Sequence, residues 1–410
     1  MDVVLDRVAG LDVHKRTVVA TVRTPGQGQR REVTRTYRTF TAELERLAAW
    51  LVTEQVGVAA MEATGVFWLP VYYVLEAAGV PVEVVNAGHV KRVPGRKTDV
   101  KDSQWLAQLA ECGLLRGSFI PPQPIRELRD LTRYRTKLIQ ERVREEQRLT
   151  KVLEDAQIKL NSVVSDPLGK SARLMMRALI AGERDPETLA ALALGRLRPK
   201  TEVLRQALYG RFNSHHAFQL RLVLDHIETI EQMIIELDAE VDRVMAPFAG
   251  DRDLLDTIPG VGKRIAEVII AEIGVDMTRF PTPECLASWA AMCPGHHESA
   301  GKHHSGKTRR GDPWLRTALV EAAWCTTRTK NSYLAAQFWR IARRRGEKRA
   351  AVAVGHSILR SAWYILSTQQ PYADLGGDYF TQRTDTQARV DYLVRQLRKL
   401  GKDITVTDAA

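Results

Sequence analysis

The chain has 410 residues, of which 44% are hydrophobic and 27% are charged. This composition is ordinary for a folded protein and excludes a chain that is disordered throughout, and the length predicts two or three domains. Lys and Arg number 60 against 49 Asp and Glu, a formal net charge of +11. With no apolar run long enough to span a membrane, this excess favours a polyanionic partner, nucleic acid above all. The first residues lack the basic start and apolar core of a secretory signal, so we expect a cytoplasmic protein.

The basic residues are concentrated in three short stretches. The first holds Lys91, Arg92, Arg96, Lys97 and Lys101, the second Lys302, Lys307, Arg309, Arg310 and Arg316, and the third Arg340, Arg343, Arg344, Arg345, Lys348 and Arg349. Clustering of this kind favours contacts with phosphates over a scatter of solubilising charge. We therefore expect these stretches to bind nucleic acid.

Residues 1–120 alternate between strands and helices and are predicted to form an α/β domain. Strands are expected over 8–13, 17–24, 32–40, 56–62 and 81–85, and helices over 41–55 and 69–78. Three meandering strands followed by strand–helix alternation give the order β-β-β-α-β-α-β-α. That order is typical of the ribonuclease H-like fold.

Residues 121–247 lose the strand pattern and are predicted to be helical. Three prolines, Pro121, Pro122 and Pro124, mark the boundary, and a highly charged helix is expected over 125–158. Further along, apolar residues recur at alternating spacings of three and four, at Leu220, Val223, Ile227, Ile230, Ile234, Leu237, Val241 and Val244. This is the seam of a coiled coil, with either the 125–158 helix or another subunit as its partner. We expect a spacer or a dimerisation arm.

Residues 248–370 form a third predicted unit, which is helical, and 371–410 form a polar tail. A Pro-Gly-Val-Gly turn that contains Gly260 and Gly262 leads into a helix that begins at Lys263. Glycines let a backbone approach a phosphate closely, and the amides at the start of the next helix can donate to it. This favours a helix-hairpin-helix element that grips DNA without reading its sequence. An ordinary helical hairpin with a glycine turn is the alternative.

Four acidic residues of the first domain are candidate metal ligands. Asp12 lies inside an apolar strand, where a carboxylate is costly unless it is paired or binds a metal. Glu62 ends the fourth strand, and Asp99 and Asp102 are three residues apart, on one face if their segment is helical. Four carboxylates that converge on one point would suit Mg²⁺ or Mn²⁺ in phosphoryl transfer. Taken singly, Asp99, Asp102 and Glu62 could be capping or surface charges.

The sequence around these carboxylates resembles the Asp-Glu-Asp-Asp transposases of the insertion-sequence-110 family. The matching segments in the first domain are Gly-Leu-Asp-Val-His-Lys at 10–15, Met-Glu-Ala-Thr-Gly at 61–65 and Lys-Thr-Asp-Val-Lys-Asp at 97–102. The third unit adds Ile-Pro-Gly-Val-Gly at 258–262, Cys-Pro-Gly-His-His-Glu-Ser-Ala-Gly at 293–301, Gly-Lys at 306–307 and Arg-Gly-Asp-Pro-Trp-Leu-Arg at 310–316. The resemblance covers most of residues 5–365 in the family's order.

The resemblance implies a bacterial DNA recombinase with two separate catalytic parts. A domain like that of Holliday-junction resolvases would hold Mg²⁺ or Mn²⁺ through the four carboxylates. A serine in the C-terminal unit would attack the DNA phosphate and form a covalent link. Such enzymes pair donor and target DNA through a structured non-coding RNA and assemble as dimers or tetramers, so the chain is expected to be nucleoid-associated when active. Phosphate contacts are expected from Lys91, Arg92, Arg96, Lys97, Gly260, Gly262, Lys263, Lys302, Lys307, Arg309 and Arg310.

Ser299 is the expected nucleophile. It lies in a glycine-rich, basic loop that permits close approach to a phosphate, and Lys302 or a metal could neutralise its alkoxide. Ala300 separates this serine from Gly301, where many family members have glycine directly after the serine. Ser305 precedes a glycine and is the alternative.

Two other functions compete with recombination. The same carboxylates could serve a metal-dependent, structure-specific endonuclease without a covalent step, since a fold alone does not decide function. A non-enzymatic nucleic-acid-binding protein is the second alternative. Trapping a covalent protein–DNA adduct would distinguish the recombinase from the endonuclease. Metal-dependent cleavage would exclude the non-enzymatic binding protein.

Overall fold

The computed structural model describes residues 3–63, 65–90, 102–295, 297–382 and 386–405. The chain divides into two compact units, Met1–Ile120 and Pro121–Ala410, and each is described by itself.

The first unit is built on a five-stranded mixed sheet. Its strands, in chain order, are β1 (Val8–Val13), β2 (Thr17–Thr24), β3 (Arg31–Arg38), β4 (Val58–Glu62) and β5 (Val82–Val85). The spatial order is β3-β2-β1-β4-β5, with β1 antiparallel to β2 and parallel to β4. β-branched and apolar residues dominate β1 and β2, which is why the sequence predicts both strands with the observed bounds.

Helices cover both faces of this sheet. α1 (Thr41–Thr53) and α2 (Trp68–Ala77) bury leucines and valines against the face that carries Leu11 and Met61. The opposite face receives α4 (Asp102–Glu111), which follows the short α3 (Ala87–Val90). The prediction that the first part of the chain is a mixed α/β domain is confirmed, and its strands and helices follow one another in the predicted order.

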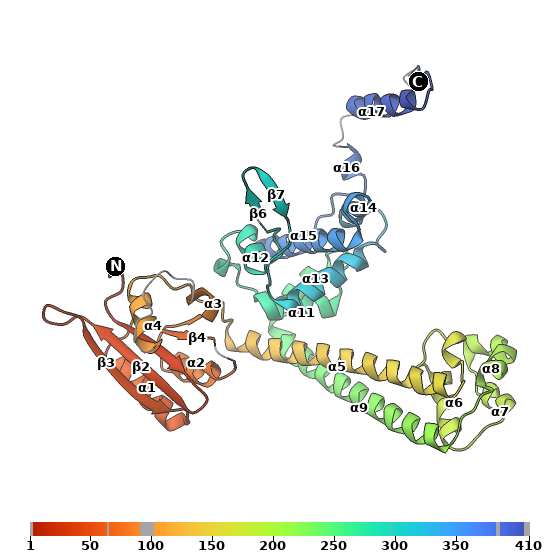
Figure 1. Cartoon of the computed structure of the whole chain (residues 1–410), viewed down its shortest axis with the longest axis horizontal. Helices are drawn as coiled ribbons and strands as arrows, with labels where there is room; N and C mark the ends of the chain where they lie inside the picture. The colour runs from red at the N-terminus through yellow and green to blue at the C-terminus, as the bar shows by residue number, and fades with distance from the viewer. Residues whose placement is uncertain (1–2, 64, 91–101, 296, 383–385, 406–410) are drawn as a thin grey trace. The chain divides into compact units, whose positions relative to one another are not determined.

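The second unit begins with two long helices that pack side by side (Figure 1). These are α5 (Gln123–Asp155) and α9 (Ser214–Met245). They run antiparallel, because Arg135 near the start of α5 pairs with Asp238 near the end of α9, and Arg142 pairs with Glu231 two turns away on each helix. Of the predicted seam, Leu220, Val223, Ile227, Ile230 and Val241 are buried. α5 is thus a partner of the seam within the same chain.

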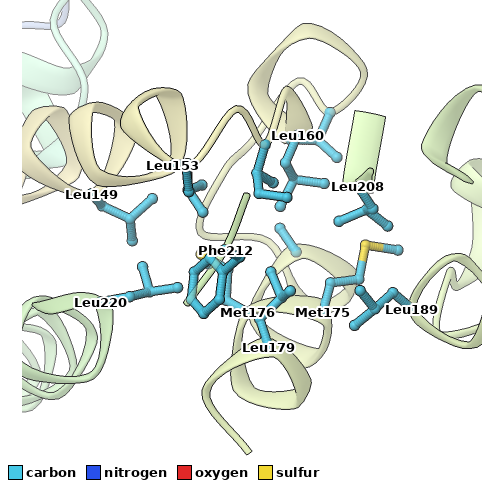
Figure 2. Packing of buried hydrophobic residues seen from close by; sticks show 14 of the residues in the cluster. Leu149, Leu153, Leu160, Met175, Met176, Leu179, Leu189, Leu208, Phe212 and Leu220 are labelled. Carbon is cyan, nitrogen blue, oxygen red and sulfur yellow. The ribbon is translucent and has the colours of Figure 1, made fainter. Parts of the chain in front are cut away.

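A small helical layer, which the sequence did not predict, joins the far ends of these two helices. It comprises η1 (Leu160–Ser162), α6 (Lys170–Ile180), α7 (Pro186–Ala191), η2 (Gly195–Lys200) and α8 (Thr201–Leu208). Figure 2 shows its core, in which Met175, Met176 and Phe212 meet leucines from the ends of α5 and α9. The predicted spacer is therefore more than a pair of helices.

The rest of the second unit is mostly helical, as predicted. Its elements are η3 (Ala246–Phe248), α10 (Ala249–Asp256), α11 (Lys263–Ile273), η4 (Met277–Arg279), α12 (Pro283–Trp289), β6 (His297–Ser299), β7 (Lys302–Ser305), α13 (Pro313–Thr326), α14 (Tyr333–Arg345), α15 (Glu347–Thr368), α16 (Tyr379–Gln382) and α17 (Thr386–Lys399). The centre of this group is α15, which packs on α12, α13 and α14. The chain beyond 370, expected to be only a polar tail, contains the helices α16 and α17. Boundaries at 247 and 370 remain predictions.

Candidate functional site

Asp12 and Glu62 lie on one face of the sheet, at the ends of adjacent strands. β1 and β4 are parallel, with Gly10 beside Ala60 and Leu11 beside Met61, so the next residues along, Asp12 and Glu62, share the Gly10 face. The Asp12 side chain is 27% exposed, and its Oδ2 lies 3.0 Å from His14 Nε2. Both carboxylates therefore stand at the carboxyl edge of the sheet, where a ligand can reach them.

α4 brings Asp102 to the same edge. A Cβ on Gly10 would lie 2.1 Å from the Ser103 carbonyl oxygen, so α4 crosses β1 in backbone contact at this glycine. Ala110, near the other end of α4, packs on Val8 at the start of β1. The helix thus runs opposite to β1, and its first residue, Asp102, lies toward the end of the strand that bears Asp12.

Three of the four predicted metal ligands can be placed, and all three lie at the same edge of the sheet. Asp99 lies outside the described residues, as do Lys91, Arg92, Arg96 and Lys97. Among the residues that the structure describes, no group of three or more His, Cys, Asp or Glu side chains is close enough to hold a metal ion. The donor set nevertheless fits magnesium, since it consists of carboxylate oxygens on a partly exposed face.

The second candidate group is the hairpin of β6 and β7. Ser299 pairs with Lys302 across a two-residue turn in which Ala300 has φ +50° and Gly301 φ +72°. Positive φ at both positions is the mark of a type I′ turn, the tightest connection of two antiparallel strands. Residues opposite one another project on the same side of a hairpin, so Ser299 and Lys302, both exposed, stand together at its tip. Ser305 lies at the base of the hairpin, opposite His297.

Glycines of the motif hold the base of this hairpin. A Cβ on Gly295 would lie 2.4 Å from the Lys307 carbonyl oxygen, and one on Gly311 would lie 2.4 Å from the Ala290 carbonyl oxygen. The chain therefore enters and leaves the hairpin in backbone contact with itself and with the end of α12. These motif glycines have a structural reason that does not involve a phosphate.

An ionic cluster around the buried Glu272 holds Asp312, which follows Gly311 in the sequence. Asp312 caps α13 by accepting from the Trp314 and Leu315 amides, and its Oδ2 lies 3.2 Å from Arg133 of α5. Arg133 also donates two hydrogen bonds of 2.7 Å to the carboxylate of Glu272, which is fully buried. The pKa of the Glu272 carboxyl is raised to about 7, chiefly by burial and also by neighbouring Asp312, although the hydrogen bonds from Arg133 lower it.

This cluster lies at a cavity that no pattern in the sequence predicts. The cavity has a volume of about 310 Å³ and lies where α5, α11 and α13 meet. Its lining includes Arg133, Arg264, Ile265, Trp314 and Glu321. No spacing in the sequence joins Arg133 to Glu272, which is 139 residues away.

The predicted helix-hairpin-helix residues lie in the turn between α10 and α11 and at the start of α11. Some of them contact other parts of the protein. Gly260 has φ +86°, and a Cβ there would lie 2.4 Å from the Ala322 carbonyl oxygen of α13, so this glycine is required for packing. Nothing lies within 4 Å of a Cβ on Gly262, which is open. Lys263 pairs with Asp242 at 2.6 Å.

The basic residues that flank the serine hairpin are exposed. They are Lys302, Lys307, Arg309 and Arg310. The Arg309 guanidinium donates to the Ser288 carbonyl oxygen at 2.9 Å, so it also ties the hairpin's exit to α12. No helix in the described part of the chain is both long and apolar enough to cross a membrane.

Comparison with family models gives matches in both units. Residues 9–158 match the transposase model DEDD_Tnp_IS110, and residues 252–340 match the model of the transposase IS116/IS110/IS902 family. The first match contains Asp12, Glu62, Asp99 and Asp102, and the second contains Ser299.

Individual relatives and one solved structure also resemble parts of this chain. A Sinorhizobium fredii protein described as a transposase, y4rJ, is 26% identical over 329 residues, which is 72% of this chain and 73% of that one. The pilin gene-inverting protein of Moraxella bovis is 33% identical over 104 residues, 24% of this chain and 32% of that one. A second S. fredii transposase, y4pF/y4sB, is 28% identical, and the match spans only 41% of its length. Thermus thermophilus RuvC is 16% identical, with a TM-score of 0.22, over 27% of this chain and 99% of that one.

Because the match at 9–158 and the match at 252–340 are both to transposase models, the chain is a transposase. The chain belongs to the IS110 family of transposases.

Proposed function

We propose that this transposase cuts and rejoins DNA by phosphoryl transfer with Ser299 as the nucleophile and a divalent metal at the carboxylates. The observation that carries the proposal is the position of Ser299, exposed at a hairpin tip beside Lys302 while the hairpin's base is held by close backbone contacts. An exposed tip on a fixed base can enter a DNA groove and still present one oxygen reproducibly.

The serine step balances without an external energy source. The Ser299 oxygen forms a bond to a DNA phosphorus, and the bond from that phosphorus to a bridging DNA oxygen breaks. The serine hydroxyl loses its proton, and the leaving oxygen gains one. The ammonium of Lys302 favours the negative charge that develops on the attacking and non-bridging oxygens. Because the phosphoserine diester keeps the energy of the broken bond, reversal of the step on another strand end needs no ATP.

The carboxylates are proposed to hold Mg²⁺ or Mn²⁺. Asp12, Glu62 and Asp102 support this because all three lie at the same edge of the sheet, and Asp99 is the proposed fourth ligand. The strand order β3-β2-β1-β4-β5 supports a ribonuclease H-like domain of the Holliday-junction-resolvase kind. A bound divalent ion would activate an attacking oxygen and stabilise a leaving one.

The proposed partners are donor DNA, target DNA and a structured non-coding RNA, with a dimer or tetramer as the assembly. The name of the M. bovis relative, a gene-inverting protein, supports DNA rearrangement. The open Gly262 and the exposed Lys302, Lys307 and Arg310 are the proposed phosphate contacts that remain accessible.

Metal dependence tests the carboxylate part of the proposal. Asp12→Asn keeps the shape of the side chain and removes its charge, so strand transfer in Mg²⁺ should fall at least about a hundred-fold. Asp6→Asn is the matched control, because the Asp6 side chain is 80% exposed and lies outside the strand. Equal rates for parent and Asp12→Asn would exclude this metal site.

The alternative is a metal-dependent endonuclease specific for branched DNA. The same carboxylates would then act by hydrolysis, and Ser299→Ala would leave cleavage of a four-way junction unchanged. Ribonuclease treatment before the recombination assay tests the RNA: undiminished strand transfer would exclude it as a guide.

A further inference from the structure

We propose that a surface at the end of α13, along α14 and at the start of α15 binds single-stranded DNA. We call this surface the tryptophan corner, and it consists of Trp324, Arg328, Trp339, Arg343, Arg344, Arg345, Lys348 and Arg349. Unpaired bases would stack on the two tryptophans, and the strand's phosphates would meet the cations.

The tryptophans of the corner are unusual in this chain because they are exposed. All eight tryptophans lie in the described residues, and only Trp324 and Trp339 are exposed, at 39% and 45%. The other six are buried or half-buried. An exposed indole leaves a large apolar surface in water, and two of them together indicate a surface that binds something.

Both indoles rest on one buried ring. The Phe338 ring lies 5.2 Å from Trp324 and 5.3 Å from Trp339, centroid to centroid, and Phe338 is fully buried. The two exposed rings are therefore held by packing, which reduces the entropy they would lose on binding a base.

In the part of the chain that the structure describes, the cations of the corner have no carboxylate partners. Arg328, Arg343, Arg344, Arg345, Lys348 and Arg349 are exposed, and within the described residues none of them forms an ion pair. By contrast, Arg173 and Arg177 of α6 are paired with acidic residues of α9. Arg343 follows Trp339 by one helical turn, so a stacking ring and a free charge share one face of α14.

The corner has a defined limit on the other side of α14. Arg340 lies 4.3 Å from the centre of the Phe380 ring of α16 and is used inside the protein. Tyr333 stacks on the same ring at 5.1 Å. α16 thus covers one side of α14 and leaves the Trp339 side open.

The combination of flat apolar rings and free cations favours an unpaired strand over other partners. Bases of a single strand offer their faces to aromatic side chains, and its phosphates offer charge, whereas a duplex hides the faces. Trp and Arg also occur at protein interfaces, but a protein partner would need a dense array of carboxylates to meet six cations, whereas a nucleic-acid strand supplies a negative charge at every phosphate. We expect the bound single strand to be DNA, because the chain is a transposase.

The test is binding of labelled oligothymidine of about 20 nucleotides, long enough for an aromatic-and-cation site. The full chain is used with EDTA present, so cleavage chemistry plays no part and failure here leaves the catalytic proposal standing. Oligouridine and a mixed-sequence duplex of the same length are the competitors. Trp324→Ala with Trp339→Ala should weaken oligothymidine binding at least about ten-fold, while Trp339→Phe keeps most of the affinity. Arg343→Gln with Arg344→Gln should lower the log–log salt slope by roughly 0.7 for each charge.

Matched controls separate the corner from general effects. Tyr209→Ala removes an aromatic ring that is 78% exposed on the small helical layer, and Arg177→Gln removes a paired cation; neither should change affinity. Circular dichroism and the unfolding midpoint check that each variant folds. Four results would each overturn the proposal: unchanged affinity in the double tryptophan variant, an equal loss for the duplex, tighter binding of oligouridine, or a changed oligomeric mass, which would make the corner a protein interface.

Discussion

The sheet edge that carries Asp12 and the hairpin that carries Ser299 are positioned in opposite ways. Asp12 and Glu62 extend from buried strands, and α4 is in backbone contact with the sheet two residues before Asp12. Ser299 stands at the tip of a two-stranded hairpin whose fixed points, Gly295 and Gly311, lie at its base. Ligands that must share one ion need a rigid frame, whereas a nucleophile that must reach a DNA strand needs exposure.

The largest expected effect comes from disturbing the rigid frame. Gly10→Ala would place a methyl group 2.1 Å from the Ser103 carbonyl oxygen, so α4 must move and carry Asp102 away from Asp12. We expect the free energy of unfolding of the first unit to fall by about 3 kcal/mol, with strand transfer falling as well. Gly57→Ala is the control, because its Cβ would meet only the Arg7 carbonyl oxygen at 3.5 Å. Denaturant unfolding of both variants measures the difference, and equal stability would show that α4 is not in contact.

The ionic cluster of Arg133, Glu272 and Asp312 should make the stability of the second unit depend on pH. The pKa of Glu272 is raised to about 7 by burial, from an ordinary value of 4.5, so the folded protein takes up a proton that the unfolded chain does not. This carboxyl's contribution to stability is therefore complete below about pH 4.5 and is lost as the pH rises through about 7. A difference of one in pKa between the folded and unfolded states corresponds to about 1.4 kcal/mol, so the loss of stability is on the order of 3 kcal/mol.

Glu272→Gln tests this dependence, since glutamine resembles the protonated acid. The variant should match the parent near pH 5 and be more stable than it at pH 8. Glu321→Gln, on the exposed side of α13, should leave the pH dependence as it is. The measurement is chemical unfolding of the second unit from pH 5 to 8, and parallel curves for the parent and Glu272→Gln would contradict the raised pKa.

The smallest effect is expected at the hairpin's turn. Ala300 has φ +50°, which costs a residue with a Cβ about 1 kcal/mol relative to glycine. Ala300→Gly should therefore slow amide hydrogen exchange in the hairpin by several-fold and leave strand transfer within about two-fold of the parent. Faster exchange in the variant would show that the turn is not of the type I′ kind.

Much of the first unit follows from local sequence, and most of the second unit's packing does not. The strand order predicts that β1 and β4 are neighbours, whereas the observed register shows that Asp12 and Glu62 share one face. The contact of Arg133 with Glu272 joins residues far apart in the chain, so no local pattern shows it. Gly260 illustrates a similar limit: the sequence suggests approach to a phosphate, and the structure gives the close approach to the Ala322 backbone.

The short helices α6 to α8 were missed for a related reason. Each has six to eleven residues, too few to be stable alone, so their stability comes from the shared core of Met175, Met176 and Phe212. Pairing of the α9 seam with α5 was one of two possibilities in the sequence, and only tertiary contacts distinguish them.

Capture of a covalent protein–DNA adduct tests the central claim most directly. Parent protein, Ser299→Ala and Ser305→Ala are each incubated with labelled substrate DNA and Mg²⁺, denatured, and examined for label that migrates with the protein. We predict an adduct on Ser299 for the parent and for Ser305→Ala, identified by mass spectrometry of the phosphoserine peptide, and none for Ser299→Ala. An adduct that persists in Ser299→Ala, or strand transfer at the parent's rate by that variant, would contradict the account.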